Sequence, residues 1–278
     1  MTNANPGKDW RGLETVRKNA ILKMLRMYKD ANAGHIGASL SCMEILLYLH
    51  FSRMTPDDKF ILSKGHAAAA LYCVLNQRGK LSDEALASFY RDGTSLAAHP
   101  PCDKSAAGII FGTGSLGHGL SLSAGLYLSR KFTGRHFNAY TVLSEGDCNE
   151  GSTWEAALFA AQHDMSGLFA IVDNNGLQGF GKSREVLNLE PLEKKWAAFN
   201  FDVEIAADGH DFRCLDAAFA ALAARGGRRP KCLIAKTIKG HGLSFMENRL
   251  ESHYLPLSVE QYETAVKEIE ESYAQRIR

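Results

Sequence analysis

A strand–helix–strand pattern in the middle of the chain constrains the fold more than any other segment. An apolar run at 139–143 precedes a helical pattern at 150–163, and a second apolar run follows at 168–172. Short apolar runs are typical of buried strands, and apolar residues spaced by three or four are typical of a helix. Strands joined through a helix lie parallel. We therefore expect an α/β fold of three layers, a mostly parallel sheet flanked by helices, formed by residues 1–278 as a single domain.

Acidic and amide side chains follow both strands of this pattern. Glu145 and Asp147 come directly after the first strand, and Asn174 and Asn175 end the second. The carboxyl ends of parallel strands share one edge of a sheet, where ligands of α/β proteins bind. Oxygen ligands suit Mg²⁺ or Ca²⁺, and Mg²⁺ commonly shares its coordination sphere with phosphates. Turn chemistry is the simpler interpretation of the same residues, but their presence after both strands favours a metal–phosphate site.

The densest glycine stretch, GTGSLGHG at 112–119, leads directly into a predicted helix at 120–131. Glycines before a helix let the backbone approach an anion, and the free N–H groups of the helix start favour phosphate. The stretch is neither a Walker P-loop nor a dinucleotide GxGxxG after a strand. We expect a phosphate contact here of another kind.

Histidines beside glycine or proline recur in the loops predicted at strand exits: His35, His66, His99 and His253. Four such residues together favour an acid–base or ligand-binding site. A zinc site is the rival hypothesis, but no pair has HxxxH-type spacing. Four other histidines carry no motif signal and are interpreted as structural: His50, His136, His163 and His210.

The remaining elements are predicted from hydrophobic periodicity and capping signals. We expect helices at 10–30, 43–51, 67–76, 82–90, 189–199, 211–225 and 259–277, and strands at 59–63, 201–206 and 231–236. Ser41 and Glu44 have the spacing of a capping box and would start the second helix at Met43. Ser82 would cap the helix that follows it. The final helix is highly charged, and we expect it to be exposed.

Composition excludes several classes of protein. A net charge of +1 gives no reason to expect nucleic acid or an anionic membrane as a partner. No apolar run approaches the roughly 20 residues that span a bilayer, and the start MTNANPGKDW lacks a signal pattern. Six cysteines without CxxC pairs indicate reduced thiols. We expect a cytoplasmic enzyme.

The motifs, in their order along the chain, resemble the amino-terminal half of transketolase, and most closely the stand-alone amino-terminal subunit of split transketolases. The resemblance extends from about Leu13 to Pro256. It rests on Ala33-Gly34-His35 with Gly37, Ser63-Lys64-Gly65-His66, Ala98-His99-Pro100, Gly114-Ser115-Leu116-Gly117-His118-Gly119, Asn149-Glu150-Gly151 with Trp154-Glu155-Ala156-Ala157, Asp173-Asn174-Asn175, and Lys236-Thr237 through His253.

The resemblance implies thiamine diphosphate with a divalent ion, normally Mg²⁺, held by a Gly-Asp-Gly signature. An alignment without gaps places Ser144-Glu145-Gly146 on that signature, which makes Glu145 the metal ligand. The alternative ligand, Asp147, requires a two-residue deletion. The other ligands would be the Asn175 side chain and the Leu177 backbone carbonyl.

The same resemblance implies roles for residues around the cofactor. The cofactor-binding set would be His66, Gly114, Leu116, Gly146, Glu150, Asn175 and His253. The catalytic set would be His35, His66, His99, His253 and Glu150. In it, His35, His99 and His253 would line the substrate channel, and Glu150 would belong to a glutamate network that couples paired cofactor sites.

The implied activity is transfer of a two-carbon ketol unit between a ketose, or its phosphate, and an aldose, or its phosphate. In the family the glutamate that activates the cofactor comes from a second, pyrimidine-binding domain. We therefore expect an α2β2 heterotetramer with a carboxyl-terminal partner subunit. One alternative is another thiamine diphosphate enzyme, similar to deoxyxylulose-phosphate synthase or specialised for an unusual sugar. The other is a non-catalytic paralogue, suggested by Glu145 in place of aspartate.

Overall fold

The strands of the protein all run in one direction and form one sheet, in the order β1-β2-β3-β5-β4. The computed structural model describes residues 9–102 and 108–277. Residues 1–8 belong to the start in which the sequence shows no signal pattern, and they lie outside the described part. The strands are β1 (Lys59–Leu62), β2 (Ala139–Ser144), β3 (Leu168–Asn174), β4 (Asp202–Ala206) and β5 (Lys231–Lys236). The predicted parallel α/β sheet is confirmed.

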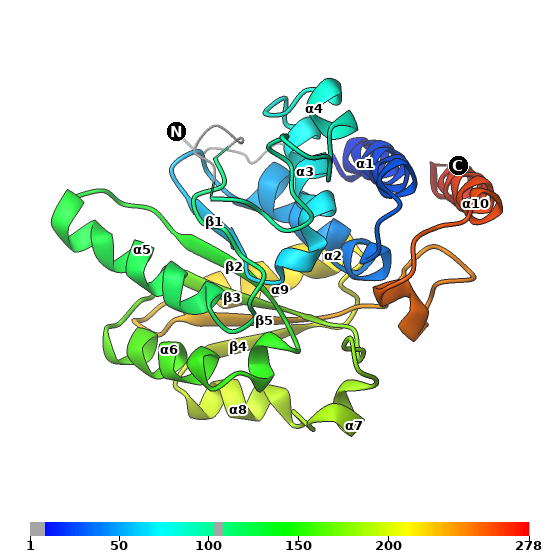
Figure 1. Ribbon diagram of the computed structural model, residues 1–278. Coiled ribbons are helices and arrows are strands. Elements are labelled where there is room, and N and C mark those ends of the chain that lie inside the picture. The colour runs from blue at the N-terminus through cyan, green and yellow to red at the C-terminus, as the bar shows by residue number, and fades with distance from the viewer. Residues whose placement is uncertain (1–8, 103–107, 278) are drawn as a thin grey trace.

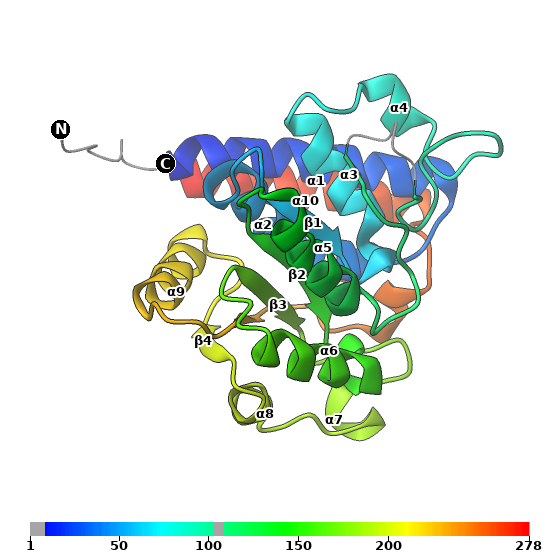
Figure 2. The ribbon, with the colours of Figure 1, turned by 90° about the vertical axis from the view of Figure 1, so that its left-hand side faces the viewer.

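Helices cover both faces of the sheet and produce three layers (Figures 1 and 2). Alternating strand residues divide the core: Val142 and Ile171 belong to one apolar cluster, whereas Leu143 and Val172 belong to the other. The first cluster is covered by α1 (Trp10–Ala31), α2 (Ile36–Tyr48), α3 (Ala68–Gln77), α9 (Phe212–Ala224) and α10 (Val259–Ile277). The second is covered by α5 (Gly119–Thr133), α6 (Gly151–Gln162) and α8 (Leu192–Ala198).

Helix α2 begins seven residues earlier than its capping signals predicted. Its first residue is Ile36, and every side chain of the helix is buried. Ser41 does not cap it, because its hydroxyl donates to Asp173 Oδ1 at 2.7 Å. Glu44 accepts from His210 Nδ1 at 2.9 Å instead of closing a capping box. The predicted start was wrong because long-range burial and hydrogen bonding outweigh the local cap signal. A π-helical turn, Leu49–Arg53, continues the helix.

Smaller differences concern the helices near the surface. Helix α4 (Asp83–Ala87) is shorter than predicted, but Ser82 caps it as expected, with its Oγ 3.2 Å from Ala85 N. Helix α7 (Ser183–Val186) was not predicted. The charged helix α10 is not exposed on all sides, because it lies along α1 and buries Ala265 and Ile269 there (Figure 2).

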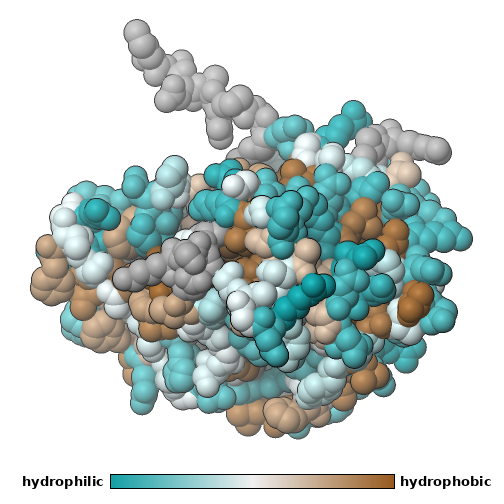
Figure 3. Space-filling model, turned by 45° about the horizontal axis from the view of Figure 1, so that its top comes forward, coloured by the Kyte–Doolittle hydropathy of each residue, from teal (hydrophilic) through white to brown (hydrophobic). Residues whose placement is uncertain are grey.

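The surface of the protein is mixed in polarity. On the face shown in Figure 3, hydrophilic residues predominate and hydrophobic residues form separate patches. Among the described residues, none of the helices has the length and apolarity that crossing a membrane requires. All six cysteines are free thiols, and of these Cys102 is exposed.

A buried ion pair lies where the strands end. Lys64, which follows β1, pairs with Asp173 of β3, and the two side chains are 1% and 0% exposed. The same carboxylate accepts from Ser41 of α2 and from Thr237, which follows β5. The Lys64 ammonium also donates to Ala38 O at 3.0 Å. One carboxylate thus joins α2 to the exits of three strands.

Replacing Lys64 with methionine should destabilise the fold by about 3–5 kcal/mol, because it leaves the buried Asp173 carboxylate without its cation. Urea denaturation of the two proteins measures the difference. The matched control is Lys131→Met on the exposed face of α5, which should change stability by less than about 0.5 kcal/mol. Equal stability of the Lys64→Met variant and the wild type would contradict the structural role of the pair.

Candidate functional site

The four histidines predicted from the sequence converge at the carboxyl edge of the sheet. The ring centroid of His35 lies 5.8 Å from that of His66 and 5.9 Å from that of His99. The His253 ring lies 5.1 Å from His35 and 5.5 Å from His66. They come from four separate segments: the start of α2, the exit of β1, the loop after α4, and the segment before α10.

Close backbone packing holds this cluster together. His35 N donates to His253 O at 3.0 Å, which ties the start of α2 to the segment before α10. A Cβ atom at Gly34 would lie 2.3 Å from Tyr254 O, so only glycine permits this approach. His35 itself has φ of +73°, an unfavourable conformation for a residue with a side chain. Strained residues of this kind concentrate at functional sites.

The burial of the histidines keeps their rings neutral. Burial lowers the pKa of His66 well below its usual value and, with help from the Lys239 charge, lowers the pKa of His253 to about 3. Burial also lowers the pKa of His35 and the pKa of His99. A neutral imidazole carries one N–H donor and one acceptor nitrogen. The cluster can therefore both donate to and accept from the hydroxyl groups of a polar ligand.

The glycine-rich loop lies against the exits of β1 and β2. Thr113 Oγ1 donates to Leu62 O at 2.7 Å, and Gly117 N donates to Asp147 Oδ1 at 2.9 Å. Gly117 has φ of +83°, and a Cβ atom there would lie 2.5 Å from Glu150 Cβ. Glu150 is exposed and precedes α6. The loop is thus fixed against both strand exits.

Leu116, Gly114 and Gly146 lie within reach of this loop and of the histidines. A Cβ atom at Gly146 would lie 2.7 Å from Leu116 Cδ1, so a larger residue there would displace the Leu116 side chain. A Cβ atom at Gly114 would lie 3.2 Å from the His99 ring. The structure therefore brings the three residues predicted from the resemblance into one neighbourhood.

The two candidate acidic residues have different surroundings. Asp147 is fully buried and accepts hydrogen bonds from Ser63 Oγ at 2.5 Å, Gly117 N at 2.9 Å and Ser144 N at 2.7 Å. Its carboxylate is committed to holding the loops. Glu145 points elsewhere, toward the residues that follow β3.

Glu145 lies beside the predicted oxygen ligands. Its carboxylate accepts from Asn174 Nδ2 at 2.7 Å and from Gly176 N at 2.6 Å. Burial raises the pKa of Glu145. Asn175 Oδ1 accepts from Leu177 N at 3.0 Å. A carboxylate has about four lone-pair sites, so these bonds leave acceptor capacity, and carboxylate, amide and carbonyl oxygens together fit Mg²⁺ or Ca²⁺.

Sequence reasoning missed Lys239, a buried cation close to these groups. This side chain is 1% exposed. Its Nζ donates to Leu177 O at 3.3 Å and to Gln178 O at 3.4 Å, and lies 2.7 Å from His253 Nδ1. Burial lowers the pKa of Lys239 to about 8, with the Lys64 charge as a second cause. These hydrogen-bond partners are neutral, so the buried ammonium suits an anionic ligand.

The signal for Lys239 was present in the sequence. It is a lysine between isoleucine and glycine in the segment TIKGHG, within the long loop that also carries His253. Because an ammonium only donates, His253 Nδ1 must accept, which leaves the proton on Nε2. Nε2 points toward Gly179, since a Cβ atom there would lie 3.1 Å from it.

A second polar cluster, Glu44, His210 and His241, lies apart from the four histidines. Its ligand-type atoms are within 4.8 Å of one another. His210 Nε2 accepts from Ile238 N at 2.9 Å, so its proton is on Nδ1, which donates to Glu44. The His210 and His241 rings are stacked 3.6 Å apart, with in-plane lone pairs that cannot share an ion. Arg17 adds a cation 3.3 Å from Glu44. These bonds and charges account for the cluster without an ion, and the interpretation of His210 as structural stays a prediction.

Fold and site together define a parallel α/β protein with a cluster of polar side chains at the carboxyl edge of its sheet. A family profile, "Transketolase, thiamine diphosphate binding domain", matches residues 14–273. An apulose-4-phosphate transketolase subunit of Phocaeicola vulgatus is 35% identical over 258 residues, which cover 90% of each chain. The 6-deoxy-6-sulfo-D-fructose transketolase subunit SqwG of a Clostridium species is 38% identical over 268 residues, 92% of this chain and 96% of that one.

The solved transketolase of Leishmania mexicana superposes with a TM-score of 0.83 at 25% identity, over 94% of this chain and 41% of that one. The protein therefore spans less than half of that longer chain. It belongs to the transketolase family and contains the family's thiamine diphosphate-binding domain. The predicted family and fold are both confirmed.

Replacing Lys239 with methionine should raise the pKa of His253 by about one unit or more, because a neighbouring cation that disfavours the imidazolium is removed. Titration of the His253 ring by NMR measures the shift. The control variant is Lys182→Met, whose side chain is exposed, and it should leave the His253 titration unchanged. A pKa that stays the same or falls in the Lys239 variant would show that the two side chains do not interact.

Proposed function

We propose that this chain, as a single domain over 1–278, is the amino-terminal subunit of a two-subunit transketolase. The enzyme would transfer a two-carbon ketol unit from a ketose, or its phosphate, to an aldose, or its phosphate. The observation that carries the proposal is the convergence of four neutral histidines with the buried Lys239 ammonium at one edge of the sheet. Thiamine diphosphate would lie at this edge.

The diphosphate end of the cofactor would lie between the glycine loop and Lys239. Backbone N–H groups of the loop at 114–116 and the ammonium of Lys239 would neutralise the phosphates. His66, Gly146 and His253 would complete the contacts. Thiamine diphosphate, when bound, supplies the electron sink that lets a C–C bond break and form.

A divalent ion, Mg²⁺ or Ca²⁺, would join the diphosphate to the residues after β2 and β3. Its ligands would be Glu145, the Asn175 side chain and the Leu177 carbonyl. The direction of the two acidic side chains supports Glu145 over Asp147, since Glu145 bonds to Asn174 and Gly176, on either side of Asn175. The longer glutamate would be accommodated by those two hydrogen bonds.

The histidines would handle the protons of the sugar hydroxyl groups. His35 and His99 lie 5.9 Å apart, and each neutral ring has one donor and one acceptor nitrogen, so they can hold a hydroxyl and receive its proton in general base catalysis. His253, whose Nδ1 accepts from Lys239, would donate to a hydroxyl from Nε2. His66 would act beside the diphosphate, and the exposed Glu150 would contact the second cofactor site of the assembly.

A partner subunit would cover this edge and supply the group that activates the cofactor. Large apolar side chains are exposed beside the site: Phe180 is 87% exposed, Leu187 56%, and Leu255 56%. Tyr254, whose hydroxyl donates to Gly179 O, is 51% exposed. Apolar surface of this kind marks protein interfaces. The relatives named as subunits support a carboxyl-terminal partner, and we infer an α2β2 heterotetramer in the cytoplasm.

The names of these relatives favour a ketol transferase that is specialised for an unusual sugar. Two of them are named for apulose-4-phosphate and for 6-deoxy-6-sulfo-D-fructose, so this chain would serve an enzyme specialised for an unusual sugar or sugar phosphate rather than for common pentoses. We propose neither a nucleic acid nor a membrane as a partner.

Mixed with the carboxyl-terminal transketolase subunit of the same genome, the chain should catalyse ketol transfer that depends on thiamine diphosphate. The chain alone should be slower by at least about two orders of magnitude, because the group that activates the cofactor is lacking. In the complex, His253→Asn should lower turnover about 100-fold, whereas the exposed His136→Ala should not. Robust turnover by the isolated chain would overturn the two-subunit proposal.

Replacing Glu145 with glutamine should raise the Mg²⁺ concentration that half-saturates cofactor binding by about tenfold or more. Isothermal titration of the complex with thiamine diphosphate at several Mg²⁺ concentrations measures the change. The matched control, Glu185→Gln on the exposed face of α7, should bind as the wild type does. A wild-type complex that binds no cofactor at millimolar concentration would instead support a non-catalytic paralogue.

A further inference from the structure

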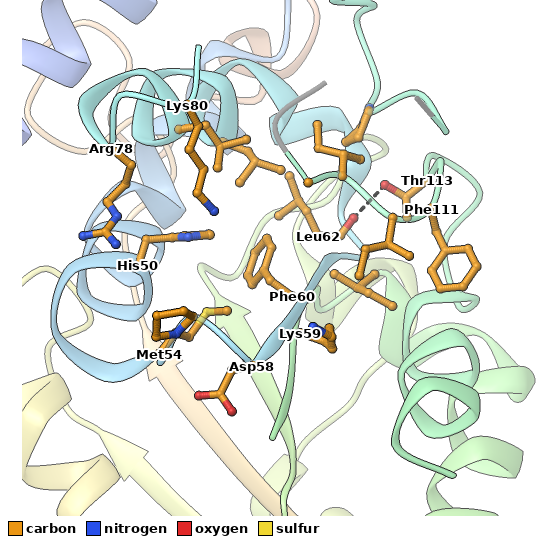
Figure 4. Close-up of a pocket in the computed structure, with 18 of the residues that line it drawn as sticks. His50, Met54, Asp58, Lys59, Phe60, Leu62, Arg78, Lys80, Phe111 and Thr113 are labelled. Atoms are coloured by element: carbon orange, nitrogen blue, oxygen red, sulfur yellow. Dashed lines mark hydrogen bonds between the residues drawn. The ribbon is translucent and has the colours of Figure 1, made fainter. Parts of the chain in front are cut away.

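A cavity of about 380 Å³ lies at the outer edge of β1, behind the cofactor loop. Figure 4 shows it between the π-helical turn after α2, strand β1 and the turn after α3. Since β1 is the last strand on this side of the sheet, no further strand covers that edge among the described residues. The volume lies within the range of about 300–1,000 Å³ of small-molecule sites.

Apolar side chains form three walls of the cavity. Phe60 and Leu62 of β1 form one wall, and Leu71 and Leu75 of α3 form another. The segment 109–111, Ile-Ile-Phe, closes a third side. An occupant would therefore bury a flat or branched apolar group rather than a sugar with its many hydroxyl groups.

Positive charge gathers at one end of this cavity. Figure 4 shows the Lys80 side chain extending toward the His50 ring, with the Arg78 guanidinium on the other side of that ring. No ion pair among the described residues involves Lys80 or Arg78. Arg78 lies over the Phe51 ring at 5.2 Å. The two cations are therefore available to an anion.

His50 supplies a neutral polar group at the same end. Its Nε2 is buried and has no hydrogen-bond partner among the described residues. The ring packs edge-on against Phe60 at 4.8 Å, which fixes its direction. A buried ring nitrogen without a partner costs free energy. Since this nitrogen has almost no accessible surface, a ligand oxygen would accept from it after a small rotation of the ring and so recover that cost.

The other two charges that line the cavity are already engaged. The Asp58 carboxylate accepts from Thr55 N at 2.9 Å and Asn138 N at 2.6 Å, and Figure 4 shows it at the far end from Lys80. Lys59 lies over the Phe137 ring at 5.4 Å. The end with Lys80 therefore keeps a net positive charge.

We propose that this cavity binds a small organic anion, a phosphate or carboxylate group carried on an apolar body. The anionic group would lie between Lys80, Arg78 and His50, and the apolar body would contact Phe60 and the α3 wall. Phosphates and carboxylates are the groups for which an arginine and a lysine supply matching donors.

The occupant would act on the cofactor loop. The wall at 109–111 leads directly through Thr113, which donates to Leu62 O, into Gly114. A ligand packed against this wall would shift the loop beside it and change the affinity for thiamine diphosphate. This regulatory effect rests on the proposed function, whereas binding in the cavity does not.

The binding test uses the full chain and isothermal titration calorimetry with phenyl phosphate, which carries both features of the ligand. Inorganic phosphate carries only the charge, and benzyl alcohol carries only the ring. Phenyl phosphate should bind at least about tenfold more tightly than either, since both parts of the cavity contribute. Equal affinity for phenyl phosphate and inorganic phosphate, or no binding of any of the three, would overturn the proposal.

Three variants assign the binding to this cavity. Lys80→Glu, on an exposed residue that should not affect folding, should weaken phenyl phosphate binding about tenfold or more. The matched surface control Lys267→Glu and the cofactor-site variant Lys239→Met should bind as the wild type does. Binding that is lost in Lys239→Met but kept in Lys80→Glu would place the anion in the cofactor site and overturn the proposal.

The regulatory effect is measured in the complex as the Kd of thiamine diphosphate with and without saturating phenyl phosphate. A change of about threefold or more that disappears in Lys80→Glu supports it. A change that persists in Lys80→Glu reports competition at the cofactor site, and an unchanged Kd also overturns the regulatory effect. If thiamine diphosphate does not bind at all, the proposed function fails while the calorimetric result on the cavity stands.

Discussion

The arrangement of the site depends on the carboxylate of Asp173 at the end of β3. A fully buried carboxylate is stable only when its charge and its oxygens have partners. The partners here come from α2, the exit of β1 and the exit of β5, so satisfying one charge fixes the positions of three loops. Each of those loops carries a site residue: His35 precedes α2, His66 follows Lys64, and Lys239 follows Thr237.

Lys239 gives the site its electrostatic character. Its charge and the burial of the rings both disfavour protonated histidines, so the cluster stays neutral beside a fixed positive charge. The segment that carries Lys239 is held on both sides, because Thr237 bonds to Asp173 and Ile238 N donates to His210. A buried His210–Glu44 pair therefore helps to position a residue that would touch the cofactor.

Much of this could be predicted from the sequence, for identifiable reasons. Strands β2 and β3 are short apolar runs followed by polar turns, so both their type and the edge they share were readable. The start of α2 was not, since Ser41 bonds to Asp173, a partner far away in the sequence. The sequence also allowed Asp147 as a metal ligand. Its hydrogen bond with Gly117 N, another residue distant in the sequence, becomes visible only in three dimensions. Lys239 gave no periodic signal, and its meaning depends on burial.

The contact between His35 and His253 has a consequence for how the protein is made. One residue lies near the beginning of the chain and the other near its end. Beside them, only a glycine at position 34 fits against the backbone of Tyr254. Domains begin to form from the amino terminus during synthesis, but this contact closes a loop that contains the whole sheet. The sheet can assemble first, and the histidine cluster is completed only when the last segment has docked. A truncated or still-growing chain would hold a sheet without a ligand site.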